Sequence, residues 1–153
     1  AGHPERRQVP EVLVLRLDAP LFWANCETTH LHILDAVDAG SQVRALVLDL
    51  EATGQMDTTT ATMLTDLLSE LRRRDVELFI ARLHYPARVV LERSGFTDSL
   101  GTGHVWHSIS QTVKAAELYV TGRPLPAVDD AVAWDLEPGA TDSGQADGTS
   151  GQP

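Results

Sequence analysis

A strand end, a loop and a helix start follow one another in residues 49–63, which read DLEATGQMDTTTATM. In residues 43–50, the two sets of alternate residues, which would face opposite sides of a strand, are both mainly apolar. This pattern is typical of a central strand that is covered on both faces. Residues 51–56 show no regular spacing of apolar residues and contain Gly54, which indicates a loop. Asp57 is then well placed to cap a helix. Leucines recur along one face of that helix with the spacing i, i+3, i+4 and i+7, at Leu64, Leu67, Leu68 and Leu71.

The same kinds of pattern divide the rest of the chain. Short β-branched and leucine-rich runs predict strands, and apolar residues that recur along one face predict helices. Strands are expected at residues 12–17, 21–24, 43–50 and 76–83, helices at 26–39, 57–74, 86–94 and 108–120, and a loop at 97–107. The order is β-β-α-β-α-β-α-α, which predicts one α/β domain of roughly 110 residues.

The charge balance of the chain is acidic and uneven. There are 12 Lys and Arg against 22 Asp and Glu, a formal net charge of −10, which disfavours nucleic acid and anionic lipid as partners. Residues 124–153 contain six acids, four prolines and four glycines, but no Lys or Arg. Residues 123–153 are therefore predicted to be an acidic, mostly disordered tail. Val128, Val132 and Leu136 are four apart, so a short helix that docks on a partner is the alternative to a solvated tail.

The sequence carries no pattern of an enzyme, a disulfide or a metal centre. The single cysteine, Cys26, excludes an internal disulfide and a CxxC pair, and it is expected to be a small buried residue. His30 and His32 are two apart on a predicted helix, so their side chains point in different directions. The chain has no P-loop, no three-glycine dinucleotide fingerprint, no GxSxG motif and no apolar run of the ~18 residues that a membrane span needs. We predict no catalytic residue, no metal site and no required cofactor.

One local feature is suited to binding a ligand or carrying a modification. It is the helix start at Asp57, Thr58 and Thr59. The first N–H groups of a helix lack partners within it, and the helix dipole is positive at that end. Such a place can accept an anion, or can carry a phosphate on its own hydroxyl. The simpler interpretation is a capped helix start whose threonines bind only backbone.

Several separated segments resemble the STAS domain, which is named for sulfate transporters and anti-sigma factor antagonists. They are residues 49–51 and 56–59, then 74–78 after the leucine-rich helix, and 91–96, and the resemblance covers residues 11–120. It implies an α/β fold with a central mixed β-sheet of about four or five strands and about four helices.

The resemblance also implies a division of the chain. Residues 1–10 would be a linker that follows a membrane domain, residues 11–122 the STAS domain, and residues 123–153 the acidic tail. The chain would then be the cytoplasmic part of an integral membrane protein, at the inner or plasma membrane.

The segment Phe22-Trp23-Ala24-Asn25 is similar to the sulfate permease (SulP) branch of the family, which has two aromatics, a small residue and Asn there. Anti-sigma antagonists tend to have an acidic residue in the place of Phe22. The similarity implies a non-catalytic regulatory domain of a SulP anion transporter, most plausibly for sulfate, that supports assembly and regulation. Its implied partners are the transmembrane domain of the same transporter, a second copy of the domain, and other regulatory proteins.

Two alternatives remain open at this stage. The antagonists' Asp-Ser-Ser-Gly stands here as Asp57-Thr58-Thr59-Thr60, so Thr59 matches their phosphorylated serine and is the candidate phosphorylation site. The chain could then be a free-standing antagonist that is switched at Thr59, or a sensor of a guanine or adenine nucleotide. The candidate ligand or partner surface comprises Asp57, Thr58, Thr59, Phe22 and Asn25.

Overall fold

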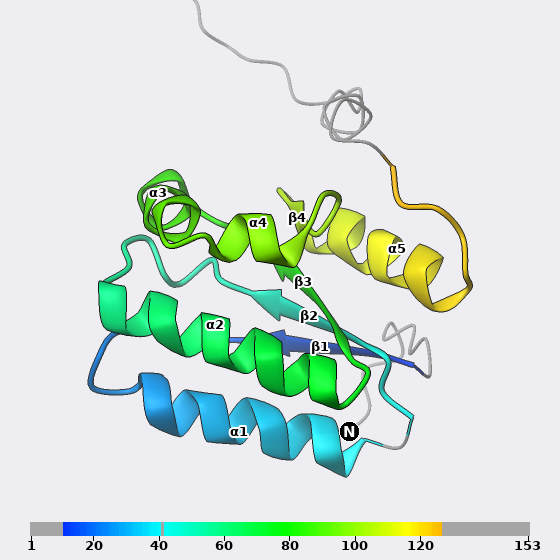
Figure 1. Cartoon of the computed structure of the whole chain (residues 1–153), viewed down its shortest axis with the longest axis horizontal. Coiled ribbons are helices and arrows are strands. Elements are labelled where there is room, and N and C mark those ends of the chain that lie inside the picture. The colour runs from blue at the N-terminus through cyan, green and yellow to red at the C-terminus, as the bar shows by residue number, and fades with distance from the viewer. Residues whose placement is uncertain (1–10, 41, 127–153) are drawn as a thin grey trace, which may run out of the picture.

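Four parallel strands form one sheet in the computed structural model, which describes residues 11–40 and 42–126 (Figure 1). The strands lie in the order in which they occur in the chain, and Val47 of the second pairs with Val14 of the first and Phe79 of the third. Their bounds are β1 (Val12–Arg16), β2 (Ala45–Asp49), β3 (Glu77–Ala81) and β4 (Val105–Trp106).

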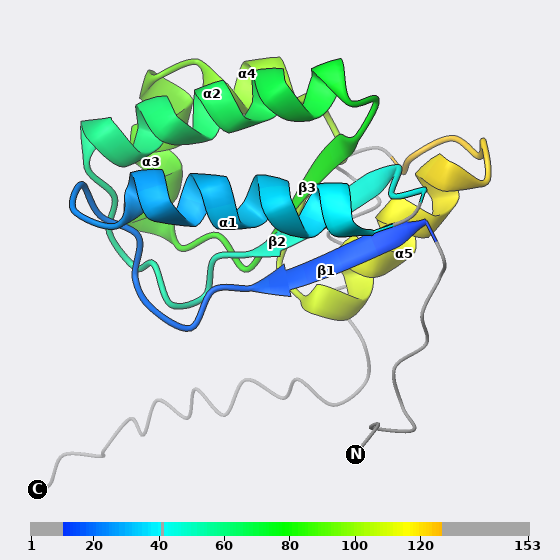
Figure 2. The ribbon, with the colours of Figure 1, turned by 90° about the horizontal axis from the view of Figure 1, so that it is seen from below.

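Helices connect each strand to the next and cover both faces of the sheet. They are α1 (Cys26–Ala39), α2 (Thr58–Arg73), α3 (Tyr85–Arg93), α4 (Phe96–Leu100) and α5 (Ile109–Val120). Leu46 and Leu48 of β2 pack into a core with residues of α1 to α4, whereas Ala45 and Val47 pack with residues of α5. Figure 2 shows α1 and α2 side by side over the sheet. The prediction of a central strand covered on both faces is therefore confirmed.

The α/β class is confirmed, but the prediction of a mixed sheet is wrong for the described strands, whose three pairings are all parallel. The reason lies in the connections. Each passes through at least one helix, and a helical crossover returns the chain to the same end of the sheet, so that the next strand runs parallel.

Two local predictions are also wrong. Residues 21–24 form no strand but a turn before α1, because the backbone N–H groups of residues 21–23 donate hydrogen bonds to the side chains of Thr53, Asn25 and Asp57. The predicted loop at 97–107 contains most of α4 and all of β4. Phe96 and Leu100, which are buried and one helical turn apart, stabilise α4 against the core.

The predicted helix ends agree well with the structure. Asp57 caps α2 by accepting a hydrogen bond from the N–H of Thr60, and Ser108 caps α5 by accepting one from the N–H of Gln111. Gly40 directly follows α1, and Gly95, with a φ of 81°, separates α3 from α4. None of the described helices is both long and apolar enough to cross a membrane. The predicted linker (1–10) and the predicted tail beyond residue 126, with Val128, Val132 and Leu136, lie outside the described residues.

Candidate functional site

The candidate site lies at the carboxyl ends of the parallel strands. The chain leaves β1 and β2 at this end of the sheet, and α1 and α2 both begin there, so their N-terminal turns are neighbours (Figure 1). Ligands of open parallel sheets characteristically bind outside the carboxyl ends of the strands. The predicted surface residues Phe22, Asn25, Asp57, Thr58 and Thr59 all belong to these two connections or to the first turn of α2.

Asp57 joins the two connections through one carboxylate. Its Oδ1 accepts a hydrogen bond from the N–H of Thr60 at 2.7 Å, and its Oδ2 accepts one from the N–H of Trp23 at 2.9 Å. Burial would raise the pKa of the Asp57 carboxyl, but the N–H groups of Thr60 and Trp23 outweigh burial and hold this pKa below its ordinary value. The carboxylate is thus held ionised as the cap of α2.

The loop before α1 is fixed by further hydrogen bonds. The side chain of Asn25 accepts from the N–H of Phe22 at 2.9 Å and donates to the carbonyl of Pro20 at 2.8 Å. The N–H of Leu21 donates to the hydroxyl of Thr53, a buried residue of the loop after β2, at 2.9 Å. The backbone of this loop is therefore defined although it belongs to no regular element.

Two aromatic side chains project from this loop into solvent. Phe22 is 45% exposed and Trp23 is 70% exposed, and their rings meet edge to face with centroids 6.3 Å apart. Exposed neighbouring aromatics on a well-defined backbone are typical of protein interaction surfaces, where Trp and Phe are enriched. Phe22 therefore stays a candidate for contact with a partner.

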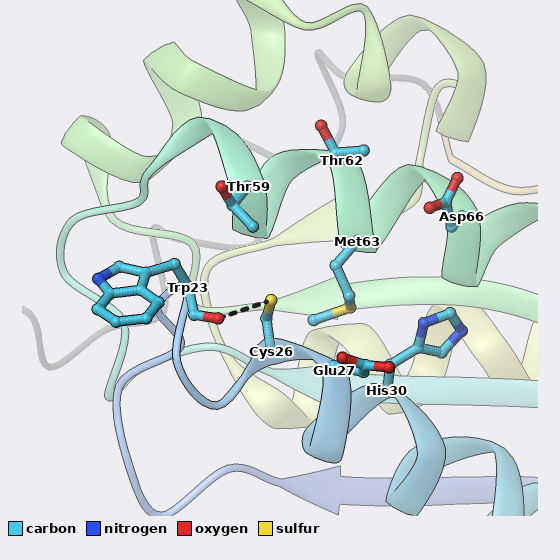
Figure 3. Close-up of a pocket in the computed structure, with 8 residues that line it drawn as sticks. All are labelled: Trp23, Cys26, Glu27, His30, Thr59, Thr62, Met63 and Asp66. Atoms are coloured by element: carbon cyan, nitrogen blue, oxygen red, sulfur yellow. Dashed lines mark hydrogen bonds between the residues drawn. The ribbon is translucent and has the colours of Figure 1, made fainter.

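A groove of about 510 Å³ opens between the first turns of α1 and α2 (Figure 3). Cys26 and Met63 point toward one another between the two helices, and Trp23 stands at one end. Cys26 is buried, as predicted, and its thiol lies 3.5 Å from the carbonyl of Trp23. The groove is lined by Trp23, Cys26, Glu27, His30, Thr59, Thr62, Met63 and Asp66.

The five predicted site residues divide into two groups. Asn25 and Asp57 use their side chains to hold the loop and to cap α2. Phe22, Thr58 and Thr59 are exposed, and Thr59 also lines the groove. The hydroxyl of Thr59 is therefore placed where a modifying enzyme or a partner could reach it.

Sequence reasoning missed an ion-pair cluster at the same end of the sheet. The Asp49 side chain at the end of β2 is fully buried, and both of its oxygens accept from Arg82, one of them from Nε at 3.1 Å. Arg82 also pairs with Glu51 at 2.6 Å, and Arg16 lies 3.9 Å from Asp49. Burial would raise the pKa of Asp49, but Arg82, the N–H of Glu51 and Arg16 together lower it. The only signal for this cluster in the sequence is that its residues lie at the ends of predicted strands, since neighbouring parallel strands bring their last residues together.

The family model of the STAS domain matches residues 3–116. The chain belongs to the STAS domain family. A probable sulfate transporter of Mycobacterium tuberculosis is 32% identical over 114 residues, which are 74% of this chain and 20% of the relative. Sulfate transporter 3.1 of Arabidopsis thaliana is 27% identical over 123 residues, which are 74% of this chain and 19% of the relative. This STAS chain thus spans about a fifth of the length of these curated relatives.

Solved structures confirm the STAS fold. A sulfate transporter family protein from Wolinella succinogenes superposes with a TM-score of 0.64 at 20% identity, over 72% of this chain and 88% of the other. The STAS domain of a SulP transporter from Vibrio cholerae superposes with a TM-score of 0.61 at 20% identity, over 74% and 86%. The predicted resemblance to the SulP branch is therefore confirmed, and relatives that are named as transporters do not favour a free-standing antagonist.

Proposed function

We propose that this STAS domain is the regulatory and interaction domain of a SulP-type anion transporter, most directly one for sulfate. In this role it carries out no catalysis of its own. It supports assembly and regulation by contacting the transmembrane domain of the same transporter, a second copy of itself or another regulatory protein. Residues 1–10 act as the linker from the membrane domain, and residues 11–122 lie at the cytoplasmic face of the membrane.

The observation that carries this proposal is the exposed aromatic pair on a fixed loop. Trp23 and Phe22 are exposed to solvent, while the N–H groups of Leu21 and Trp23 are bonded to Thr53 and Asp57. A surface whose backbone is already ordered loses little conformational entropy when a partner binds. The polar side chains around it, Asn25 and Asp57, are engaged in holding the loop, which suits a docking surface better than a reaction centre.

Within this role we assign Thr59 as the residue that receives a phosphate. It is exposed, and it belongs to the first turn of α2, where free N–H groups and the helix dipole favour a negative charge. A phosphate there stands on the wall of the groove beside the aromatic loop, so that modification changes the charge of the proposed partner surface.

The first test is the coding sequence upstream of Ala1. The proposal expects several hydrophobic segments of about 20 residues each, the last of them ending shortly before the linker. Uptake of labelled sulfate by cells that express the full reading frame then tests the substrate. An initiation codon immediately before the codon of Ala1, with no upstream segments, would refute the transporter assignment. Uptake of another anion in place of sulfate would correct the substrate alone.

A further inference from the structure

The groove end of α1 and α2 carries acidic side chains and no Lys or Arg. The two helices contain Glu27, Asp35, Asp38, Asp66 and Glu70, and their two arginines, Arg72 and Arg73, lie in the last turn of α2. The residues that line the groove include Glu27 and Asp66 but no Lys or Arg. The surface around the groove is therefore anionic.

Two of these acids flank the groove and are unpaired within the described residues. Glu27 lies in the first turn of α1 and Asp66 in α2, both are exposed, and neither forms an ion pair with another described residue. Near the other end of the two helices, Asp38 and Glu70 pair with Arg74 at 2.9 and 3.1 Å, whereas Asp35, in the middle of α1, forms no ion pair with another described residue. Negative charge is thus neutralised near Arg74 and left open at the groove.

Cys26 and Met63 form an apolar floor between these acids, in a groove that His30, Thr59 and Thr62 also line. Cys26 and Met63 are each 5% exposed, and Trp23 adds an aromatic wall at one end (Figure 3). Methionine adapts its shape to an inserted side chain, and an aromatic wall provides a large contact area. An aliphatic side chain fits this floor, with a cationic side chain on either side of it facing Glu27 and Asp66.

We infer that the groove between α1 and α2 receives an amphipathic helical segment of a partner, one that presents an aliphatic side chain flanked by Lys or Arg. A groove along two helices is a common seat for such a helix. The inference rests on the proposed function, because the cytoplasmic loops of membrane proteins carry an excess of Lys and Arg. The chain's own residues 124–153 are an unsuitable occupant, since their charged side chains are all acidic.

The test is an NMR titration of the ¹⁵N-labelled 153-residue chain. One probe is a synthetic peptide of about 14 residues, four helical turns, made of Leu and Lys in an amphipathic pattern, and the other has Glu in place of Lys. The Leu/Lys peptide is expected to shift the signals of Trp23, Glu27, Thr59 and Asp66, and to bind more weakly as salt is raised. The Leu/Glu peptide is expected not to bind there.

The key variant is Glu27→Gln with Asp66→Asn, which removes both charges and keeps the side-chain shapes. Loss of two exposed ion pairs is expected to weaken binding of the Leu/Lys peptide roughly tenfold. The matched control is Glu92→Gln with Asp98→Asn, which removes two exposed charges from α3 and α4 and is expected to leave binding unchanged. Circular dichroism checks the fold of each double variant.

Trp23→Ala is a further variant that is expected to weaken binding. It replaces a side chain that is 70% exposed.

Four results would overturn the inference. The first is no binding of the Leu/Lys peptide, and the second is equal weakening in the two double variants. The third is peptide-induced shifts confined to residues 124–153, and the fourth is groove shifts that appear with protein concentration in the absence of peptide, which would assign the groove to a second copy. These outcomes are separate from the fate of the proposed function. Upstream membrane segments with sulfate uptake, but no peptide binding, would leave the transporter assignment standing and remove only the docking site.

Discussion

The backbone N–H of Trp23 donates to Oδ2 of Asp57 at 2.9 Å, between residues that are 34 positions apart in the chain. The other oxygen of the same carboxylate caps α2 through the N–H of Thr60. One side chain therefore contributes both to the start of α2 and to the position of the exposed aromatic loop. Loss of this carboxylate is expected to disturb both places.

Replacing Asp57 by Ala is expected to cost about 2 kcal/mol of unfolding free energy. The loss of an N-cap costs about 1 kcal/mol, and loss of the bond to Trp23 adds about as much. Urea denaturation measures the effect. Ser108→Ala is the control, because Ser108 caps α5 through the N–H of Gln111 and its side chain holds no second loop. Equal costs for the two variants would show that the bond to Trp23 contributes nothing.

Asp57 also gives the stability a pH dependence of known sign. Its pKa is lowered in the folded protein, although burial acts the other way, because N–H groups stabilise the carboxylate. A lowered folded-state pKa stabilises the fold above the ordinary value of 3.8, and this contribution is lost as the pH falls through the lowered value. The unfolding free energy of the unsubstituted chain is expected to fall more steeply than that of Asp57→Asn below about pH 4. Parallel pH profiles would contradict this.

The regular elements other than α4 and β4 could be predicted because their causes are local. The leucine spacing from Leu64 to Leu71 reflects burial of one helix face, and the apolar run of β2 reflects cover from both sides. The turn at Phe22 and Trp23 could not be predicted from such patterns. Its apolar residues resemble a strand, but Thr53 and Asp57, more than 30 positions away, hold its backbone and leave both rings in solvent.

The ion pair between Asp49 and Arg82 illustrates a second limit of sequence patterns. Neither residue has a neighbour in sequence that indicates the pairing. Their meeting depends on the register of β2 with β3, in which Asp49 lies opposite Ala81, and Arg82 follows with a φ of 57°. The start of α2 at Asp57 was predictable from the local sequence, whereas the pairing of Asp49 with Arg82 depends on how β2 and β3 lie together.

Replacing Arg82 by Met is expected to destabilise the domain more than replacing Arg16 by Met. Arg82 is the main partner of the buried Asp49 carboxylate, whereas Arg16 is 64% exposed and lies 3.9 Å away. An uncompensated buried charge is strongly destabilising, and a neutral amide is much less so. Adding Asp49→Asn to Arg82→Met should therefore recover part of the loss in thermal unfolding. No recovery would show that Arg82 acts through packing rather than charge.

The end of the folded domain can be located by truncation. Leu125 packs against the core beneath α5, and its Cβ lies 3.2 Å from the position that a Cβ on Gly103 would take. A chain that ends at residue 126 keeps this contact, and one that ends at residue 122 loses it. The shorter chain is expected to lose about 1 kcal/mol and to melt about 3–6 °C lower. Equal melting temperatures would place Leu125 outside the stabilising core.

Thr59→Glu tests the proposed phosphorylation site and the groove together. The substitution adds a carboxylate to the wall that also carries Asp66, without removing any hydrogen bond seen for Thr59. We expect it to tighten binding of the Leu/Lys peptide roughly twofold to fivefold, since one added exposed ion pair contributes up to about 1 kcal/mol. If the proposed function holds, it should also change the initial rate of sulfate uptake by the full-length protein. Thr102→Glu, at an exposed position between α4 and β4, is the matched control and should change neither measurement.

Two outcomes of the Thr59→Glu experiment would change the assignment. Tighter peptide binding with unchanged uptake would separate docking from regulation. No effect of Thr59→Glu on either measurement would remove Thr59 from the partner surface.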